Sequence, residues 1–241
     1  MQSVNPVPRT APITDVRLTP AYYVRPEGLG PYVAALLGRC SSVFDIKAAM
    51  ADDLAHGGEQ LRDGQGVVED GAVVQGEVIV QAGARIEAGA QVIGPVLICT
   101  GAVVAAGAMV RDHSVIGPGC RIGFGAEITR SLLAGHVFMK HPSFIGDSVI
   151  GRRVNVGSFC STTGLRCDCG PVPEPAIQEI TVNLDGRRLP TGQTKFGAVI
   201  GDEVALPAGT VLSPGTLIGP GTVVYPRDHI GGFLPAGSRV R

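Results

Sequence analysis

Aliphatic residues recur at every sixth position through the middle of the chain. They are Val68, Val74, Val80, Ile86, Val92, Ile98, Val104, Val110, Ile116, Ile122 and Ile128. A helix repeats its apolar face every 3.6 residues and an amphipathic strand every 2, so neither explains a sustained period of six. A short strand followed by a corner, repeated along the chain, does explain it. The pattern predicts an all-β fold, a parallel β-helix of hexapeptide repeats.

A second register accompanies the first, four residues after each aliphatic position. Its members are Ala72, Val78, Ala84, Ala90, Val96, Ala102, Ala108, Ser114, Cys120, Ala126 and Leu132. All but Leu132 are small or β-branched, as expected for side chains that point inward beside a narrow corner. Glycines such as Gly71 and Gly119 supply the corners. Three hexads then form one triangular coil of eighteen residues, and coils stack at the inter-strand spacing of about 4.7–4.9 Å.

The pattern divides the chain into residues 1–63, which lack the hexad, and a β-helix over residues 64–241. The prolines of the first part predict an extended or turn-rich segment; they are Pro6, Pro8, Pro12, Pro20, Pro26 and Pro31. A helix is expected from Asp45 to His56, with Ile46, Met50 and Leu54 as its apolar stripe and Gly57 after its end. We expect this region to be a small, partly helical cap over the open first coil, whose interior and backbone would otherwise be exposed.

The hexad is interrupted twice. A second register of Phe144, Ile150, Val156 and Thr162 starts sixteen residues after Ile128, which is not a multiple of six, so the segment 132–142 is expected to bulge. A polar insertion follows at about 165–196. The hexads then resume at Ile200, Leu206, Leu212, Ile218 and Val224. Because regular coils act as scaffold, these two interruptions are the places where functional loops are expected.

Composition and charge narrow the possible functions. The hydrophobic content of 44% is enough for a continuous core. The net charge is −1, so no basic surface favours nucleic acid as a partner. The N-terminus has no signal-peptide pattern and no apolar run approaches the 18 residues of a membrane span, so a cytoplasmic protein with no membrane partner is expected. Cys99, Cys120 and Cys160 are expected to be buried thiols, and Cys167 and Cys169 loop thiols.

Five segments carry a family resemblance. They are residues 121–131, 138–151 around His141, 154–158, 165–168 and 191–202. In that order they resemble the C-terminal acetyltransferase half of bifunctional sugar-1-phosphate nucleotidylyltransferase/acetyltransferases, especially the archaeal type, over about residues 66–240. The resemblance implies a left-handed β-helix, a homotrimer, acetyl-CoA or another acyl-CoA as co-substrate bound between subunits, acetylation of an amino-sugar phosphate, and no metal. Residues 1–63 are too short for the nucleotidylyltransferase domain.

The resemblance also implies roles for individual residues. His141 matches the general base, in keeping with a near-neutral pKa that suits an imidazole to take a proton from an amine or hydroxyl. Lys195 matches a lysine that holds the sugar phosphate or the oxyanion, and Asn155 an asparagine that contacts substrate. The expected substrate-binding residues are Arg111, Arg130, Lys140, Phe144, Gly164 and Arg166. The coils of the acyl-CoA cleft are expected to contain Gly157, Ser158 and Ala208.

Two departures from the family pattern keep other hypotheses open. Gly164 stands where the family has a catalytic asparagine, and Phe144 where it has a tyrosine; both changes remove hydrogen-bonding groups. The leading hypothesis is an acyl-CoA-dependent acyltransferase acting on an amino sugar, a sugar phosphate or a related polar metabolite. The second is a catalytically inactive trimeric scaffold or regulatory homologue. The third is a metalloenzyme like the γ-class carbonic anhydrases, suggested by the spacing of His136 and His141.

Overall fold

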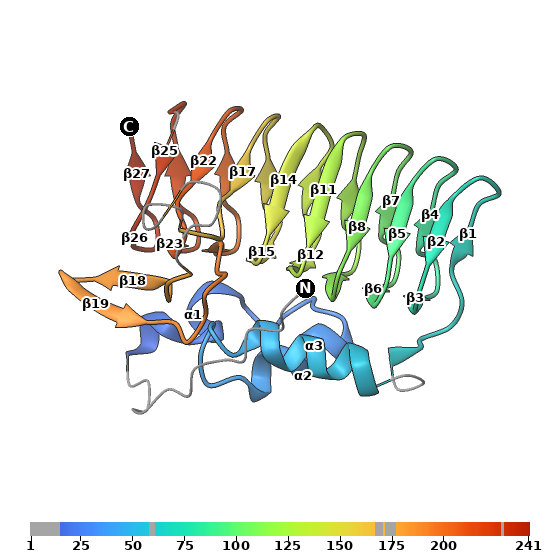
Figure 1. The fold of residues 1–241 in the computed structure, drawn as a ribbon, viewed down its shortest axis with the longest axis horizontal. Coiled ribbons are helices and arrows are strands. Elements are labelled where there is room, and N and C mark those ends of the chain that lie inside the picture. The colour runs from blue at the N-terminus through green and yellow to red at the C-terminus, as the bar shows by residue number, and fades with distance from the viewer. Residues whose placement is uncertain (1–14, 58–60, 167–170, 172–176, 228) are drawn as a thin grey trace.

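A three-sided prism of short parallel strands, with helices along one of its sides, makes up the molecule (Figure 1). The computed structural model describes residues 15–57, 61–166, 171, 177–227 and 229–241. The predicted fold class, an all-β, left-handed parallel β-helix with a small helical N-terminal region, is confirmed. Cys99, Cys120 and Cys160 are buried free thiols, as expected, whereas Pro6, Pro8, Pro12, Cys167 and Cys169 lie outside the described residues.

Three parallel sheets, named A, B and C here, form the faces of the prism. Sheet A contains β1 (Val67–Val68), β4 (Arg85–Ile86), β7 (Val103–Val104), β10 (Arg121–Ile122), β13 (Phe138–Met139), β16 (Asn155–Val156), β21 (Ala205–Leu206), β24 (Val223–Val224) and β27 (Arg239–Val240). Sheet B contains β2 (Val73–Gln75), β5 (Gln91–Ile93), β8 (Met109–Arg111), β11 (Ala126–Thr129), β14 (Ser143–Gly146), β17 (Ser161–Thr162), β22 (Val211–Leu212) and β25 (His229–Ile230). Sheet C contains β3 (Val78–Val80), β6 (Val96–Ile98), β9 (Ser114–Ile116), β12 (Leu132–Gly135), β15 (Val149–Arg152), β20 (Ala198–Ile200), β23 (Thr216–Ile218) and β26 (Phe233–Leu234).

The hexad residues fill the interior of the prism. In the regular coils each strand pairs with the strand one coil later, for example Ile86 with Val104 and Val104 with Ile122. Hexad side chains from Ile86 to Ile128 belong to one core cluster and are at most 1% exposed. Val68 and Val74 of the first coil are 46% and 38% exposed, because no earlier coil among the described residues covers them.

One position of the predicted second register is wrong: Ile150, Val156 and Thr162 are buried as expected, but Phe144 does not face the core. Ile128 pairs with Ile145, which is buried in the core, whereas Phe144 lies on the outer face of sheet B. The segment 132–142 does not bulge. Instead, the passage from sheet B to sheet C is one residue shorter in two successive coils, since Arg130 (φ 45°) and Asp147 (φ 53°) each turn it alone in the left-handed conformation.

Three serines occupy the small position next to this passage. Ser131, and not Leu132 as predicted, occupies the small inward position of its coil, whereas Leu132 faces outward. Ser114 and Ser148 occupy the same position in the coils before and after it, and all three serines are buried. The Ser131 hydroxyl donates to Thr129 O and accepts the Ser148 N–H at 3.0 Å. This satisfies polar groups that would otherwise be buried without partners.

The N-terminal region lies along the outer face of sheet C and not over the first coil, so the expected position of the cap is wrong for the described residues (Figure 1). It comprises the 3-10 helix η1 (Val16–Leu18) and the helices α1 (Pro20–Tyr23), α2 (Pro31–Arg39) and α3 (Ile46–His56). The helices cover a column of outward apolar residues, which are Ile79, Leu97, Val115, Leu132, Val149, Val199 and Leu217. The helices dock on sheet C because docking removes this apolar column from contact with water.

The helices themselves follow simple local rules. Residues 46–56 form the expected helix, and its predicted stripe of Ile46, Met50 and Leu54 is buried. Pro20 and Pro31 do not mark extended chain; each is the first residue of a helix, where its missing N–H costs nothing and its fixed φ suits the helix.

An antiparallel hairpin of β18 (Thr181–Leu184) and β19 (Arg187–Pro190) lies within the insertion between β17 and β20. Figure 1 shows it projecting beside the helices at the C-terminal coils. Phe196, at the end of the insertion, is fully buried and packs edge-on against Phe44, with ring centroids 5.4 Å apart. The end of the insertion at Phe196 is therefore held between the helical region and the prism.

Candidate functional site

The edges of the prism divide the expected site residues into two groups. We name the A/B corner the passage from sheet A to sheet B, and the B/C and C/A corners likewise. The A/B corner and its approach hold Lys140, His141, Gly157, Ser158 and Ala208, with Asn155 exposed on the neighbouring strand β16. The B/C corner holds Arg111, Arg130, Gly164, Arg166 and Lys195. His141 and Lys195 thus lie on opposite edges of sheet B.

His141 is an exposed residue between β13 and β14. The backbone around it is fixed by hydrogen bonds between coils: Phe159 N–H donates to Pro142 O at 2.6 Å, and the Ser143 hydroxyl donates to Gly157 O at 2.9 Å. An exposed imidazole on a rigid backbone is able to accept a proton from a bound nucleophile.

The residues expected at the acyl-CoA cleft form a narrow column of small side chains. Ser158 and Ala208 occupy equivalent places in successive coils, and Gly209 N–H donates to Ser158 O at 2.8 Å. A Cβ on Gly157 would stand 2.6 Å from Ala208 N, so close stacking of the coils requires glycine there.

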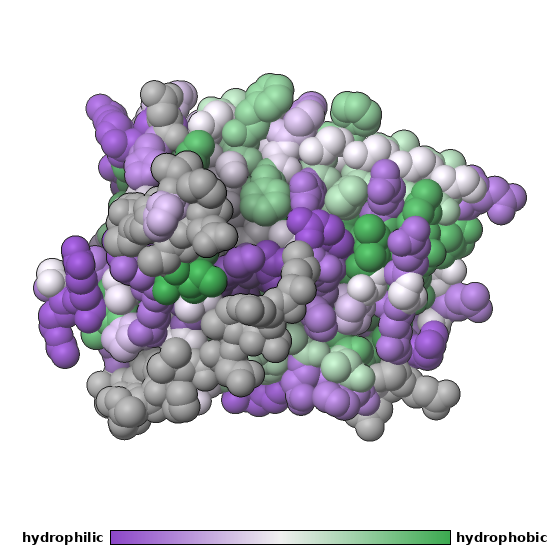
Figure 2. Space-filling view, in the orientation of Figure 1, coloured by the Kyte–Doolittle hydropathy of each residue, from purple (hydrophilic) through white to green (hydrophobic). Residues whose placement is uncertain are grey.

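Two exposed aromatic residues lie at this corner that were not predicted from the sequence as site residues. Phe124 is 70% exposed and Phe159 is 71% exposed. Phe159 also has a φ of 60°, in a column where other coils place glycines such as Gly107 and Gly125. A bulky residue in the left-handed region is uncommon and costs free energy. Figure 2 shows apolar side chains standing out along the upper edge of the prism, where this corner lies.

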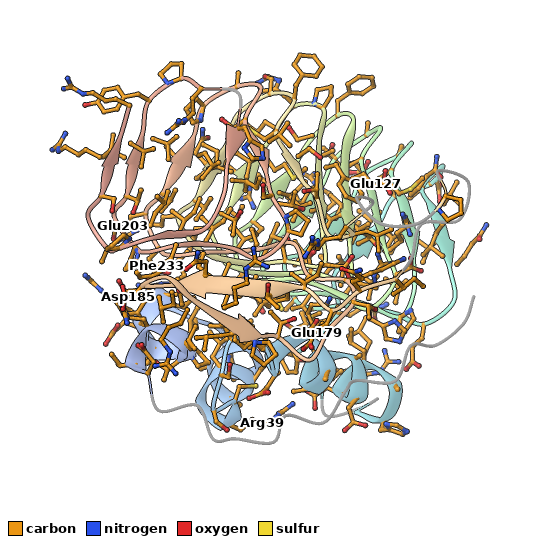
Figure 3. The ribbon with its side chains drawn as sticks, turned by 60° about the vertical axis from the view of Figure 1, so that its left-hand side comes forward. Arg39, Glu127, Glu179, Asp185, Glu203 and Phe233 are labelled. Carbon is orange, nitrogen blue, oxygen red and sulfur yellow. The ribbon has the colours of Figure 1, made fainter. Side chains whose placement is uncertain are left out.

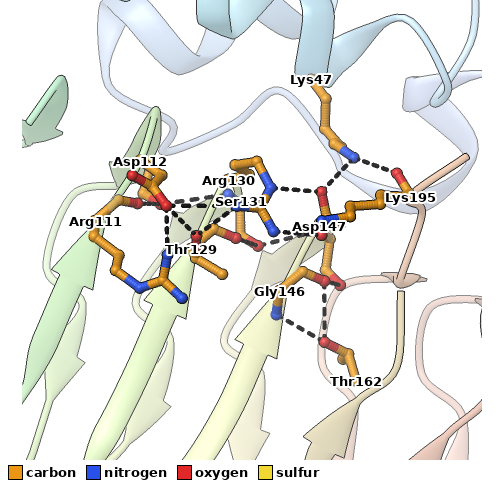
Figure 4. A network of polar contacts seen from close by, with 12 residues as sticks. Lys47, Arg111, Asp112, Thr129, Arg130, Ser131, Gly146, Asp147, Thr162 and Lys195 are labelled. Carbon is orange, nitrogen blue, oxygen red and sulfur yellow. Dashed lines mark hydrogen bonds and ion pairs between the residues drawn. The ribbon is translucent and has the colours of Figure 1, made fainter. Parts of the chain in front are cut away.

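The B/C corner carries a network of charges on successive coils (Figure 4). Arg111 Nη2 lies 2.8 Å from Glu127 Oε1, and its Nη1 pairs with Asp112. Arg130 donates through Nε and Nη2 to both carboxylate oxygens of Asp147 at 2.9 Å. Two of the three arginines expected to bind substrate, Arg111 and Arg130, are therefore held by carboxylates of this chain.

Asp147 is the centre of the network. Its side chain is 7% exposed, and its Oδ1 accepts a hydrogen bond from Lys47 Nζ of α3 at 2.8 Å. Burial by itself raises the pKa of Asp147, but Arg130 and Lys47 outweigh burial and hold that pKa below its ordinary value. Burial lowers the pKa of Lys47, against the opposing effect of Asp147. Neither Lys47 nor Asp147 was assigned a role from the sequence, and a contact across one hundred residues leaves no local signal.

The insertion returns to the prism next to Asp147. Lys47 Nζ donates a second hydrogen bond to Lys195 O at 2.6 Å, and Gln193 Nε2 donates to Phe44 O at 2.8 Å. The Lys195 residue is exposed, in contrast to the buried Phe196 that follows it. Figure 4 shows Lys47, Asp147 and Lys195 together, below helix α3.

The two departures from the family pattern lie beside this network. A Cβ on Gly164 would stand 3.2 Å from Asp147 Oδ2, which is tighter than ordinary van der Waals contact. A Cβ on Gly146 would stand 2.7 Å from Cζ of Phe144, so the phenyl ring lies along sheet B towards the B/C corner. Asp147 and Phe144 occupy space that larger residues at 164 and 146 would need.

The remaining expected residues line two shallow hollows. Lys140 lines one of about 350 Å³ on sheet A, together with Arg85 and Arg121, and its ammonium lies 5.2 Å from the centre of the Phe138 ring. Arg166 lines another of about 290 Å³ beside Arg188 of the hairpin.

The pair suggested as metal ligands is separated within the chain. His136 lies at the C/A corner and His141 at the A/B corner, at opposite ends of β13. Within the part of the chain that the structure describes, no group of three or more His, Cys, Asp or Glu side chains is placed to hold a metal. None of the described helices is long and apolar enough to cross a membrane.

Comparison with known proteins gives relatives of one kind. The bifunctional sugar-1-phosphate nucleotidylyltransferase/acetyltransferase of Sulfurisphaera tokodaii is 30% identical over 190 residues, which are 79% of this chain and 44% of that protein. The bifunctional protein GlmU of Methanocaldococcus jannaschii is 39% identical over 142 residues, which are 59% of this chain and 33% of that protein. The chain spans less than half the length of these relatives.

The structure of UDP-N-acetylglucosamine acyltransferase from Campylobacter jejuni has 15% sequence identity to this chain and a TM-score of 0.28, with 74% of this chain and 72% of that one covered. The overall similarity of the two structures is low. A family model described as the GMPPB C-terminal domain matches residues 92–224, more than half of the chain. The expected resemblance to the sugar-1-phosphate enzymes is confirmed, and the chain belongs to the GMPPB C-terminal domain family.

Proposed function

We propose that this protein transfers the acyl group of an acyl-CoA, with acetyl-CoA as the expected donor, to an amino sugar, a sugar phosphate or a related polar metabolite. The observation that carries the proposal is the exposed His141 on the A/B corner, next to the small-residue column of Ser158 and Ala208. It is supported by a relative, 30% identical, that is named a nucleotidylyltransferase/acetyltransferase. A narrow column of small side chains suits the slender acyl-bearing arm of coenzyme A.

The proposed reaction assigns a task to each group. The His141 imidazole accepts a proton from the attacking amine or hydroxyl as the new bond to the acyl carbon forms. The tetrahedral oxyanion is stabilised by backbone N–H groups or by a cation such as Lys195. The carbon–sulfur bond then breaks, and the proton held by His141 passes to the departing CoA thiolate. Asn155 is proposed to orient the acceptor.

The separation of His141 from Lys195 by sheet B favours a site shared between copies of the chain. Sheet C is covered by helices, so a neighbouring copy has the outer faces of sheets A and B available. In a closed trimer the A/B corner of one copy would approach the B/C corner of the next. Sedimentation velocity should give three times 24.8 kDa. Sedimentation at the monomer mass would contradict the trimer.

An acceptor screen tests the activity. The purified chain is mixed with acetyl-CoA and with glucosamine-1-phosphate, other amino-sugar phosphates or unphosphorylated amino sugars, and free CoA thiol and acetylated product are measured. We expect thiol release that depends on an acceptor and falls about 10²- to 10⁴-fold in His141→Ala. His136→Ala, at the other end of β13, is the matched control and should keep its activity. Thiol release that ignores the acceptor, or that persists in His141→Ala, would contradict the proposal.

A second candidate is a non-catalytic scaffold or regulatory homologue. The charge balance of the B/C corner favours it, because the cations Lys47, Arg111 and Arg130 face the carboxylates Asp112, Glu127 and Asp147. The matching result is a trimer that shows no heat of acetyl-CoA binding in calorimetry. Measurable binding of acetyl-CoA together with acceptor-dependent turnover would reject this candidate.

A further inference from the structure

A lysine of the N-terminal helices reaches into the candidate site from outside the β-helix. Lys47 is the second residue of α3, and its side chain is only 13% exposed. It lies outside residues 92–224, which match the family, so nothing in that match accounts for it. A buried ammonium group costs free energy unless it is paired, and a well-packed apolar residue would join helix to prism as well or better. Its charge therefore calls for an explanation beyond packing.

The two acceptors of Lys47 are both parts of the candidate site. Its Nζ donates to Lys195 O at 2.6 Å and to Asp147 Oδ1 at 2.8 Å. Asp147 in turn accepts both hydrogen bonds from the Arg130 guanidinium. One buried amine thus connects the backbone of Lys195, an expected site residue, to Asp147 and through Asp147 to the side chain of Arg130.

The backbone after Lys195 is fixed on the prism. Phe196 N–H donates to Gly164 O, and Gly197 N–H donates to Asp147 O, both at 2.9 Å. Since the Lys195 carbonyl belongs to the peptide that joins Lys195 to Phe196, the bond from Lys47 fixes the rotation of that peptide. The direction in which the exposed Lys195 side chain leaves the backbone depends on this rotation.

We propose that Lys47 is a positioning residue for acyl transfer: its bonds to Lys195 O and Asp147 hold the Lys195 ammonium where it meets the acceptor. This inference rests on the proposed function. Lys47 touches no reacting atom; it acts through Lys195 and, by way of Asp147, through Arg130.

The test compares Lys47→Met with Arg17→Met. Both wild-type side chains tie the N-terminal region to the insertion, but they bind different parts of it. Arg17 pairs with Asp185 at 2.5 Å, at the turn of the hairpin between β18 and β19, whereas Lys47 binds Lys195 O. Figure 3 labels Asp185 at that turn. In Lys47→Met we expect kcat/KM for the acceptor to fall at least tenfold while KM for acetyl-CoA stays unchanged, because the Lys195 ammonium is proposed to meet the acceptor and not the bound coenzyme A. Arg17→Met should keep wild-type kinetics, and Lys47→Arg, which retains a cation, should recover part of the loss.

A double-mutant cycle tests whether Lys47 acts through Lys195. Lys195→Met should lose activity, and adding Lys47→Met to it should lose little more, since the group to be positioned is already gone. Hydrogen exchange at the Phe196 and Gly197 amides should be faster in Lys47→Met and unchanged in Arg17→Met. If Lys47→Met does not fold, Lys47→Arg decides the question by the same split between acceptor and donor constants.

The outcomes separate the two proposals. A wild-type protein that releases no CoA with any acceptor overturns the proposed function and this inference with it. An active wild type whose Lys47→Met variant keeps its acceptor kcat/KM overturns this inference alone. So do fully additive losses in the cycle, or equal losses in Lys47→Met and Arg17→Met.

Discussion

The two edges of sheet B turn the chain by different means. The A/B corner uses glycines in the left-handed conformation, such as Gly89, Gly107 and Gly125, and leaves His141 and Phe159 exposed. The B/C corner places charged residues such as Arg130 and Asp147 in that conformation and pairs them with one another. Charged side chains at an interruption of the repeat are therefore not by themselves evidence of a binding site, because the fold can use them to join its own parts.

The largest effect is expected at the B/C corner, when Asp147 loses its charge. Asp147→Asn leaves Lys47 and Arg130 without their shared carboxylate, and we expect the free energy of unfolding to fall by about 3–5 kcal/mol. Asp112→Asn, whose side chain is 36% exposed in the wild type, should cost about 1 kcal/mol or less. Urea unfolding of both variants measures the difference, and equal losses would contradict the central role of Asp147.

Acid titration sharpens the same comparison. The pKa of Asp147 in the folded protein lies below the ordinary 3.8, so the folded state holds fewer protons than the unfolded state between the two values. The stability from the carboxylate is then fully present above pH 3.8 and is lost as the pH falls through the folded value. The difference in the free energy of unfolding between wild type and Asp147→Asn should become smaller in that pH range. A difference that does not change with pH would argue against the ion pairs.

The next effect concerns which residue of β14 faces the core. Ile145→Ala should cost about 2–5 kcal/mol, because Ile145 is buried inside the prism. Phe144→Ala should cost about 1 kcal/mol or less, since its ring lies on the outer face of sheet B. Unfolding free energies in the reverse order would restore the register in which Phe144 points inward.

A side chain at position 164 should lower the free energy of unfolding, because it would crowd the B/C corner. Gly164→Ala brings a methyl group to 3.2 Å from Asp147 Oδ2, and we expect a loss of about 1–2 kcal/mol. Gly38→Ala is the control, because nothing lies within 4 Å of its added methyl group and its place inside α2 favours alanine. It should stabilise the protein by up to about 1 kcal/mol. A Gly164→Ala variant as stable as wild type would mean that Asp147 has room to move.

The smallest effect is expected at the exposed aromatic residue of the A/B corner. Phe159→Gly removes a side chain that is 71% exposed and relieves a φ of 60°, so stability should rise by about 0.5–1 kcal/mol in thermal unfolding. Phe124→Gly, at an exposed position without positive φ, should bring no such gain. A loss in Phe159→Gly would show that the phenyl ring makes contacts that offset its backbone conformation.

The core of the prism and helix α3 could be predicted because both follow from local spacing. The inward place of Ile145 could not be predicted, since a repeat of six assumes corners of constant length and nothing marks Arg130 or Asp147 as a shorter turn. The sequence does contain a signal for the face of the prism on which the helices dock. Every third hexad has an aliphatic residue just before its inward position, and Leu97, Val115 and Leu132 are examples.

The candidate site could be predicted only in part. The motifs assign His141, Arg130 and Lys195 to the coils and the insertion around the interruptions of the repeat, but they carry no information on the edge of the prism at which each residue lies. The charge pairing was also out of reach, because Lys47 and Asp147 meet only when the helices dock on sheet C. Such contacts depend on the whole fold and not on the neighbouring sequence.

The helices on sheet C change how the molecule should unfold. In a repeat protein each coil contacts only its neighbours, so stability is a sum of local terms and the ends can fray independently. Here one helical layer packs on a column of residues from Ile79 to Leu217, which belong to seven strands of the same sheet. If one coil unfolded, the helices would also lose part of the surface on which they pack. A chain built from repeats should therefore unfold in one cooperative step and not coil by coil.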